Sequence, residues 1–154
     1  MATRLPEGKH ALTPNLVVKG GRAALAFYAD AFGAEVLGTF ENDGIVMHAE
    51  VRIGDSVFTV CDAMPDYGLA AADPSGPVHA SFMLYVDDVD AVFARAVELG
   101  ATPLEAPSLQ FHGARAGSIR DPFGHRWTLN THLEDVSPEE LARRVDAFMA
   151  TMDS

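Results

Sequence analysis

Two segments of this chain share one outline, a glycine turn followed by a strand of alternating side chains. Residues 52–61 turn at Gly54 and residues 120–130 turn at Gly124, and an extended run follows each turn. Three pairs of landmarks are separated by nearly the same distance, 68, 67 and 70 residues: Val18 with Val86, Gly33 with Gly100, and Gly54 with Gly124. A nearly constant offset of this kind predicts that one supersecondary unit occurs twice.

Each copy of the repeat is predicted to contain a strand, a helix and then three more strands. In the first copy the helix is expected over residues 22–32, because apolar side chains recur at three- and four-residue steps and Gly33 follows as a cap. The strands of the first copy are expected over residues 13–18, 36–41, 45–53 and 56–61. The second copy is expected to contain a helix over residues 89–99 and strands over residues 79–86, 102–105, 116–120 and 125–130.

The predicted fold class is α+β, with two tandem βαβββ modules that form a curved mixed sheet around a cleft. A single module leaves one face of its sheet bare, and two modules side by side curl the bare faces into a cleft. A C-terminal helix to about Met149 is also expected, because Ser137, Pro138 and Glu140 make a strong helix start.

The linker between the modules is expected where prolines and glycines interrupt the pattern, over residues 63–78. The whole chain is then predicted to divide into five parts: a flexible arm over residues 1–10, a first module over 11–62, the linker over 63–78, a second module over 79–131, and the C-terminal helix over 132–154.

Charge and composition limit the partners of this chain. Its formal net charge is −11, which disfavours nucleic acids and anionic membrane surfaces because both attract a basic face. No apolar run approaches the roughly 20 residues of a membrane helix, and the start of the chain is too polar for a secretory signal. Cys61 is the only cysteine, so an intramolecular disulfide is excluded. We therefore expect a cytoplasmic protein.

Four stretches, in this order, carry a family resemblance: residues 26–34, 47–56, 84–90 and 121–127. They resemble the vicinal oxygen chelate superfamily, which includes glyoxalase I, bleomycin-resistance proteins and extradiol dioxygenases. Within it the chain is similar to the PhnB-like branch, which residues 132–140 also match. The resemblance covers about residues 12–145. It implies a homodimer, often with modules paired across the two chains.

The resemblance also implies where a metal would bind. In metal-using members the ligands come from the first and last strands of each module, and the corresponding positions here are Thr13, Phe58, Ser81 and Thr128. None of the four is a histidine or a carboxylate, and such a set cannot hold a divalent metal. No cofactor is therefore predicted, although a metal bound through a non-standard set of residues stays an alternative.

The strongest candidates for catalysis are His48 and Glu50, which are two residues apart and therefore share one strand face. In one interpretation His48 is a base and Glu50 an orienting carboxylate, or both begin an alternative metal site. In the other they belong to an ordinary polar strand face, on which Glu50 pairs with Arg52.

The predicted ligand-binding set is larger, and it includes three residues at the positions just described, Thr13, Ser81 and Thr128. Four apolar side chains are expected to line the cleft, or else to lie in the core: Phe58, Met83, Tyr85 and Phe111. Asp62 is expected to face the cleft beside them. Arg115 and Arg120 are the cations nearest the loop of residues 111–115, and one of them can hold a carboxylate or phosphate, with surface ion pairs as the alternative.

Two functions follow from these residues. The first is a metal-independent protein that binds a small apolar or aromatic molecule. The second is an enzyme of the same superfamily that acts on a small carbonyl or oxygenated substrate. In that case His48 serves as the base or as part of a non-standard metal site.

Overall fold

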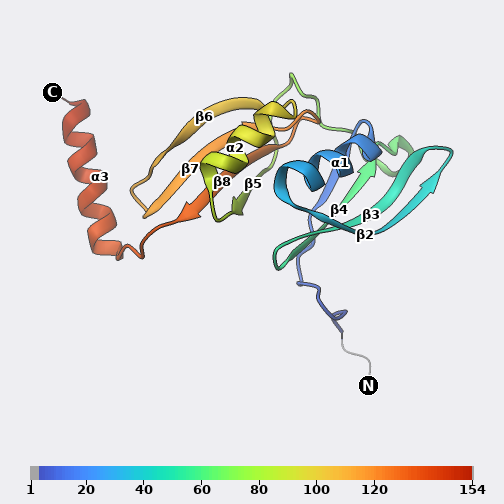
Figure 1. Cartoon of the computed structure of the whole chain (residues 1–154), viewed down its shortest axis with the longest axis horizontal. Helices are drawn as coiled ribbons and strands as arrows, with labels where there is room; N and C mark the ends of the chain where they lie inside the picture. Colours follow the sequence, from blue (N-terminus) through green and yellow to red (C-terminus); the bar gives the residue numbers. More distant parts are fainter. Residues whose placement is uncertain (1–3, 154) are drawn as a thin grey trace.

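The computed structural model describes residues 4–153 and contains two consecutive βαβββ modules followed by a long helix (Figure 1). The first module consists of β1 (Asn15–Val18), α1 (Gly21–Phe32), β2 (Glu35–Asn42), β3 (Ile45–Ile53) and β4 (Ser56–Asp62). The second consists of β5 (Ser81–Tyr85), α2 (Val89–Glu98), β6 (Thr102–Leu109), β7 (Ala114–Arg120) and β8 (Arg126–His132). A short 3₁₀ helix, η1 (Pro65–Tyr67), lies in the linker, and α3 (Pro138–Met152) follows the second module. The predicted α+β class is confirmed.

The strands form two four-stranded sheets with the same topology. The strand order is β1-β4-β3-β2 in the first sheet and β5-β8-β7-β6 in the second. In each sheet the first strand of the module runs parallel to the last, and the other neighbours are antiparallel. The prediction of mixed parallel and antiparallel strand pairing is therefore confirmed, and the strands form two sheets.

The helix ends follow from local chemistry. Gly20 and Gly33 flank α1 with φ angles of 92° and 67°, a left-handed conformation that glycine adopts at little cost. Asp88 caps α2 by accepting a hydrogen bond from the amide of Ala91. The predicted cap of α3 is confirmed, because the Ser137 side chain accepts a hydrogen bond from the amide of Glu140. α3 continues to Met152, beyond the predicted end near Met149.

β6 is longer than predicted. The strand is predicted to end at residue 105, but it continues to Leu109. β6 is the edge strand of its sheet, where a proline can lack its N–H without removing a ladder bond. Its pairing with β7 shifts register twice, and the prolines are accommodated in this irregular ladder.

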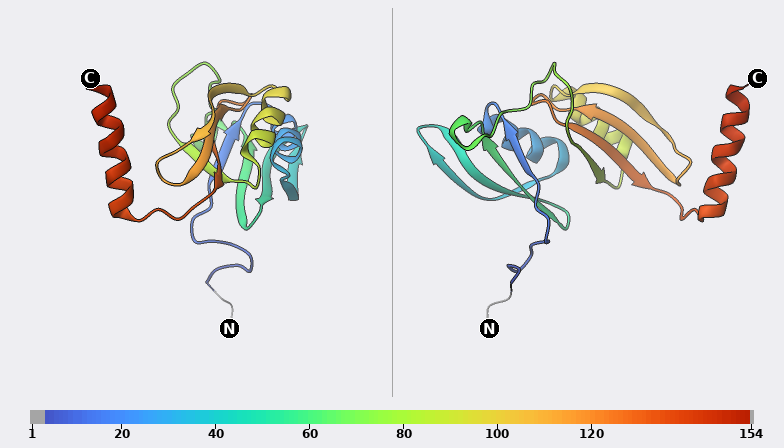
Figure 2. Two further views of the ribbon diagram at one scale, coloured as in Figure 1. Left: turned by 60° about the vertical axis from the view of Figure 1, so that its left-hand side comes forward. Right: turned by 180° about the vertical axis from the view of Figure 1, so that it is seen from behind.

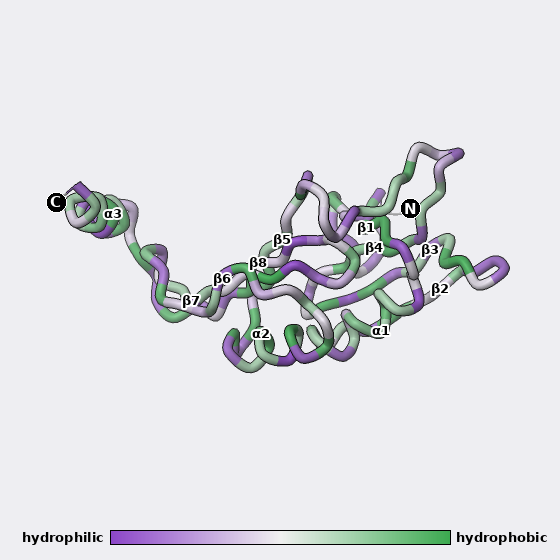
Figure 3. The backbone as a smooth tube through the Cα atoms, turned by 90° about the horizontal axis from the view of Figure 1, so that it is seen from above, coloured by the Kyte–Doolittle hydropathy of each residue, from purple (hydrophilic) through white to green (hydrophobic). Residues whose placement is uncertain are grey.

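The two modules share one hydrophobic core. α1 and α2 lie side by side on the same side of the molecule (Figure 3). The ring of Phe32 in α1 lies 4.9 Å from that of Trp127 in β8, and Phe58 of β4 lies 6.1 Å from Trp127. Buried aromatic rings contribute much of the free energy of a core, so these contacts between modules hold the two units together.

The other face of each sheet has no helix over it. From behind, the strands are in view and the two helices lie beyond them (Figure 2). We call these uncovered surfaces the open faces. α3 stands away from both sheets, and its Phe148 ring lies 5.0 Å from Phe111 in the loop between β6 and β7. No helix in residues 4–153 is long and apolar enough to cross a membrane.

Candidate functional site

The open face of the second sheet brings together several side chains predicted to bind a ligand. Between β5 and β8, Met83 lies opposite Thr128, and Ser81 lies opposite Arg126. Tyr85 follows on the same face of β5 because side chains alternate along a strand. Met83 and Tyr85 expose 61% and 62% of their surface, so they are available to a ligand or a partner.

The open face of the first sheet carries His48 and Glu50. Glu50 lies opposite Thr59, whose hydroxyl donates a hydrogen bond of 2.7 Å to the side-chain oxygen of Asn15. The ammonium of Lys9, in the N-terminal arm, lies 2.5 Å from the Glu50 carboxylate. This hydrogen bond, with the nearby charges of Lys9 and His48, lowers the pKa of Glu50 below its ordinary value. Glu50 is thus paired with Lys9 and not with Arg52, which pairs with Glu35.

Phe58 and Asp62 lie on the opposite face of β4 from the one predicted. Phe58 lies opposite the buried Val51 and is only 6% exposed, whereas its neighbour Thr59 lies on the open face. Apolar residues occur on both faces of β4, and a one-residue difference in register reverses the side on which each one lies. Phe58 is therefore a core residue, and the residue at the predicted position on the open face is Thr59.

Asp62 has a structural role. Its Oδ1 accepts hydrogen bonds of 2.9 Å from the amides of Gly20 and Gly21, and its Oδ2 accepts one of 2.8 Å from the amide of Val46. The carboxylate thereby satisfies free N–H groups at the start of α1 and joins the helix to β3. Asp62 was predicted to face the cleft, but both of its oxygens accept bonds from these amides and the residue is only 8% exposed.

The two arginines that were predicted to bind an anion make other contacts within the chain. Arg115 makes a bidentate ion pair with Asp90 of α2, at 2.7 and 2.8 Å, which raises the pKa of Arg115 and lowers that of Asp90. The alternative of a surface ion pair is therefore confirmed for Arg115. Arg120 donates to three backbone carbonyls, those of Asp73, Gly76 and Gly124.

Phe111 and Thr13 lie outside the strands. Phe111 is in the loop between β6 and β7 and packs against α3, so it does not line an open face. Its expected place in a cleft is wrong, because the longer β6 carries the loop to the far end of the sheet. Thr13 is exposed in the arm just before β1.

An apolar pocket of about 380 Å³ lies where the N-terminal arm crosses the junction of the two modules. We call it the aromatic pocket, and its main walls are Leu12, Phe58, Phe82, Met83 and Trp127. His10 lies at its rim, where its Nε2 is 3.0 Å from the carbonyl of Asp55. Phe58 thus lines a pocket between the modules, although it does not lie on the open face.

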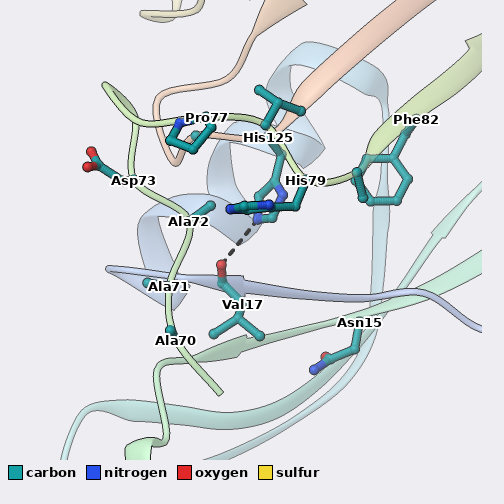
Figure 4. Close-up of a pocket in the computed structure, with 13 residues that line it drawn as sticks. Asn15, Val17, Ala70, Ala71, Ala72, Asp73, Pro77, His79, Phe82 and His125 are labelled. Carbon is teal, nitrogen blue, oxygen red and sulfur yellow. Dashed lines mark hydrogen bonds between the residues drawn. The ribbon is translucent and has the colours of Figure 1, made fainter. Parts of the chain in front are cut away.

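A second pocket, of about 370 Å³, lies between the linker and β1 (Figure 4). His125 donates a hydrogen bond of 3.1 Å from Nε2 to the carbonyl of Val17, which joins the second turn to the first sheet. His79 lies beside His125, with Asn15 and Phe82 on the other side of the pocket. Phe82 also lines the aromatic pocket, so its ring separates the two cavities.

A third hollow, of about 370 Å³, is polar and shallow, and we call it the arginine hollow. It is lined by Val78, His79, Ala80, Ser81, Arg126 and Thr128. Arg126 was not among the predicted site residues, although its alternation with Trp127 along β8 places it on the same face as Thr128. Asn130, also missed, follows on that face and is fully buried. Its Oδ1 is the one buried side-chain N or O atom in residues 4–153 without a hydrogen-bond partner.

Residues 9–129 match the model of the Glyoxalase/Bleomycin resistance protein/Dioxygenase superfamily. The chain belongs to this superfamily. An uncharacterized protein of Mycobacterium tuberculosis is 38% identical over 135 residues, which cover 85% of this chain and 79% of that protein.

Solved structures agree with this assignment. A gene product of Arabidopsis thaliana is 28% identical, with a TM-score of 0.62 over 78% of this chain and 97% of that one. The PhnB protein of Bacillus cereus is 19% identical, with a TM-score of 0.63 over 79% of this chain and 99% of that one, which shows a shared fold. The resemblance to the superfamily, with PhnB-like structural neighbours, is confirmed.

The donors at the superfamily's metal-ligand positions do not fit a divalent ion. In this chain the strand positions hold the hydroxyls of Ser81 and Thr128, with Thr59 on the open face in place of Phe58, and Thr13 lies just before β1. Neutral hydroxyls are weak ligands compared with imidazole or carboxylate. Within residues 4–153, no group of three histidine, cysteine, aspartate or glutamate side chains is arranged to hold an ion.

Proposed function

We propose that this protein binds a small apolar or aromatic molecule without a divalent metal. The aromatic pocket is the observation that carries the proposal. Its volume of about 380 Å³ suits a ligand of one or two rings, and Phe58, Phe82 and Trp127 supply aromatic walls. The hydroxyl donors at the metal-ligand positions support a function that needs no metal.

We also propose a homodimer in which the open faces are closed by a second copy of the chain. A single chain leaves the large side chains of Phe40, Met83 and Tyr85 exposed on these faces, at 64%, 61% and 62%. Exposed apolar surface of this extent favours an interface. A sedimentation mass of twice the 16.5 kDa of one chain is expected at micromolar concentration, and a mass of 16.5 kDa would rule out the dimer.

The proposed location is the cytoplasm. Cys61 is a free and buried thiol, and the formal net charge of −11 disfavours binding to an anionic membrane surface. Fractionation of cells that express the protein from its own gene tests this, and recovery with the membrane pellet would contradict it.

A second candidate is an enzyme in which His48 acts as a base on a small carbonyl or oxygenated substrate. The supporting observation is that His48 is exposed on an open face and is near enough to Glu50 to affect the pKa of that carboxyl. Since Lys9 holds the Glu50 carboxylate, His48 would have to act without Glu50 as its orienting partner. Turnover of a substrate that is lost in His48→Ala would favour this candidate over simple binding.

The binding proposal is tested by thermal stabilisation with indole as the probe. Indole is expected to raise the midpoint of unfolding of the wild-type protein, and Phe82→Ala should remove this effect because it deletes a wall of the pocket. Tyr67→Ala is the matched control, since Tyr67 is an exposed aromatic residue outside the pocket. Equal stabilisation of both variants would contradict the proposed site.

A further inference from the structure

Of the three arginines in the second sheet, Arg126 is the one whose guanidinium contacts other residues of 4–153 through a single nitrogen. Arg115 and Arg120 are held by Asp90 and by backbone carbonyls, as described above. In Arg126 only Nη2 makes contacts, at 3.3 Å to Glu105 and 3.3 Å to Ser118. Its Nε and Nη1 bond to no residue in the described part of the chain, residues 4–153. The N–H groups of Nε and Nη1 are therefore available to a ligand.

The surroundings of Arg126 add hydroxyl donors on the same face. Ser81 lies opposite Arg126 in the parallel β5–β8 register, and Thr128 is two residues further along β8. Both line the arginine hollow with Arg126. The Ser118 hydroxyl lies 3.3 Å from that of Thr128 and 3.3 Å from Nη2 of Arg126, and it is almost fully buried. A planar guanidinium next to hydroxyls is the donor set that recognises carboxylate or phosphate oxygens.

We propose that the arginine hollow binds the anionic group, a carboxylate or a phosphate, of the ligand. This rests on the proposed function, because Met83 lines the aromatic pocket and is the next residue after Ser81 on the same face of β5. The ligand class is therefore a small acid with an apolar or aromatic body. The body lies toward Met83, and the acid group lies on Arg126.

Glu105 competes with such a ligand for the guanidinium. Its carboxylate is 66% exposed, and its contact of 3.3 Å with Arg126 is long for a charge-assisted hydrogen bond. An exposed pair of this kind contributes little free energy, so an incoming anion can replace it. Removal of the Glu105 charge is then expected to strengthen anion binding, a gain that misfolding cannot imitate.

The test is calorimetric titration of the wild-type protein with benzoate, phenyl phosphate and the neutral benzyl alcohol. At least one anion is expected to bind about 10-fold more tightly than benzyl alcohol, since hydrogen bonds to a charged group are worth that much. The tighter of the two anions then identifies the acid group.

The variants locate the anion. Arg126→Gln should weaken anion binding about 10-fold and leave benzyl alcohol unchanged, and Glu105→Gln should strengthen anion binding. Arg115→Gln is the matched control and should change neither. Equal affinity for the anions and benzyl alcohol, or no effect of Arg126→Gln, would overturn the inference and leave the proposed function standing. If none of the three probes binds, the inference is also overturned, and the proposed function fails with it if indole does not bind either.

Discussion

The hydroxyl of Tyr28 donates a hydrogen bond of 2.7 Å to Oδ2 of Asp121, and this contact joins the two modules through their shared core. Both residues are buried. The same carboxylate oxygen accepts a bond of 2.9 Å from the indole N–H of Trp127, and Oδ1 accepts from the amides of Phe123 and His125. Asp121 thus holds the second turn together and also binds α1 of the first module.

Tyr28→Phe should destabilise the protein by about 2 kcal/mol, because it removes a hydrogen bond to a buried carboxylate. Chemical denaturation measures this loss. The matched control is Tyr67→Phe, which removes a hydroxyl from a tyrosine that is 78% exposed. A free energy of unfolding equal to that of the wild type in both variants would contradict the assigned role of the bond.

The same bond predicts a dependence of stability on alkaline pH. Burial, and then the neighbouring Asp121 charge and hydrogen bond, raise the pKa of Tyr28 well above its ordinary value of 10.0. A folded-state pKa above the unfolded one gives a stability that is complete below about pH 10 and is lost as pH rises beyond it. The free energy of unfolding should therefore fall more steeply above pH 10 in the wild type than in Tyr28→Phe. Parallel pH profiles would contradict this.

Asp62→Ala should destabilise the protein by about 3 kcal/mol or more, because it leaves three amide donors without their acceptor. Asp62→Asn keeps one acceptor oxygen and should therefore lose less of the free energy of unfolding. The matched control is Asp66→Ala, an exposed carboxylate in η1. If Asp62→Ala unfolds at the same denaturant concentration as this control, the structural role of Asp62 is refuted.

Gly21→Ala should also be destabilising. A Cβ at residue 21 would lie 2.7 Å from Cβ of Val46 and 2.8 Å from Oδ2 of Asp62, closer than such atoms can approach. Overpacking of this kind costs about 1–3 kcal/mol. Gly38→Ala is the control, because a Cβ there meets no atom within 4 Å. Thermal unfolding of the two variants checks the difference, and equal midpoints would contradict it.

The N-terminal arm should open in acid. Its Lys9 holds Glu50, whose pKa is lowered below the ordinary value. A lowered folded-state pKa gives a stabilisation that is present above the unfolded pKa, about 4.3, and is lost as pH falls through the lower one. Protection of residues 9–12 from hydrogen exchange, expressed relative to the intrinsic exchange rate at each pH, should fall in Lys9→Met at neutral pH, and in the wild type only below about pH 4. Unchanged exchange in Lys9→Met would show that the pair does not hold the arm.

The fold could be predicted because repeated local signals agree with it. The glycines after the helices and the cap at Ser137 are short-range features, the constant offset shows that the unit is repeated, and each was found where expected. β5 could also be predicted from the sequence, since Ser81, Met83 and Tyr85 alternate with apolar neighbours. β6 was underestimated because sequence alone does not reveal that it lies at an edge, where its prolines are tolerated.

The site could be predicted only in part. β4 is apolar on both faces, so its pattern does not indicate which side Phe58 and Asp62 occupy. Asp90, the partner of Arg115, and two of the three partners of Arg120 are 25 residues or more away along the chain, so the fold decides which arginine stays available. Arg126 could have been found from its alternation along β8 with Thr128.

The most direct test of the central claim is calorimetric titration of indole into protein that has been treated with EDTA and dialysed. The account predicts the same dissociation constant before and after this treatment, with no change when zinc, manganese, nickel or iron(II) is added back. Binding that disappears with EDTA and returns with one of these metals would contradict it.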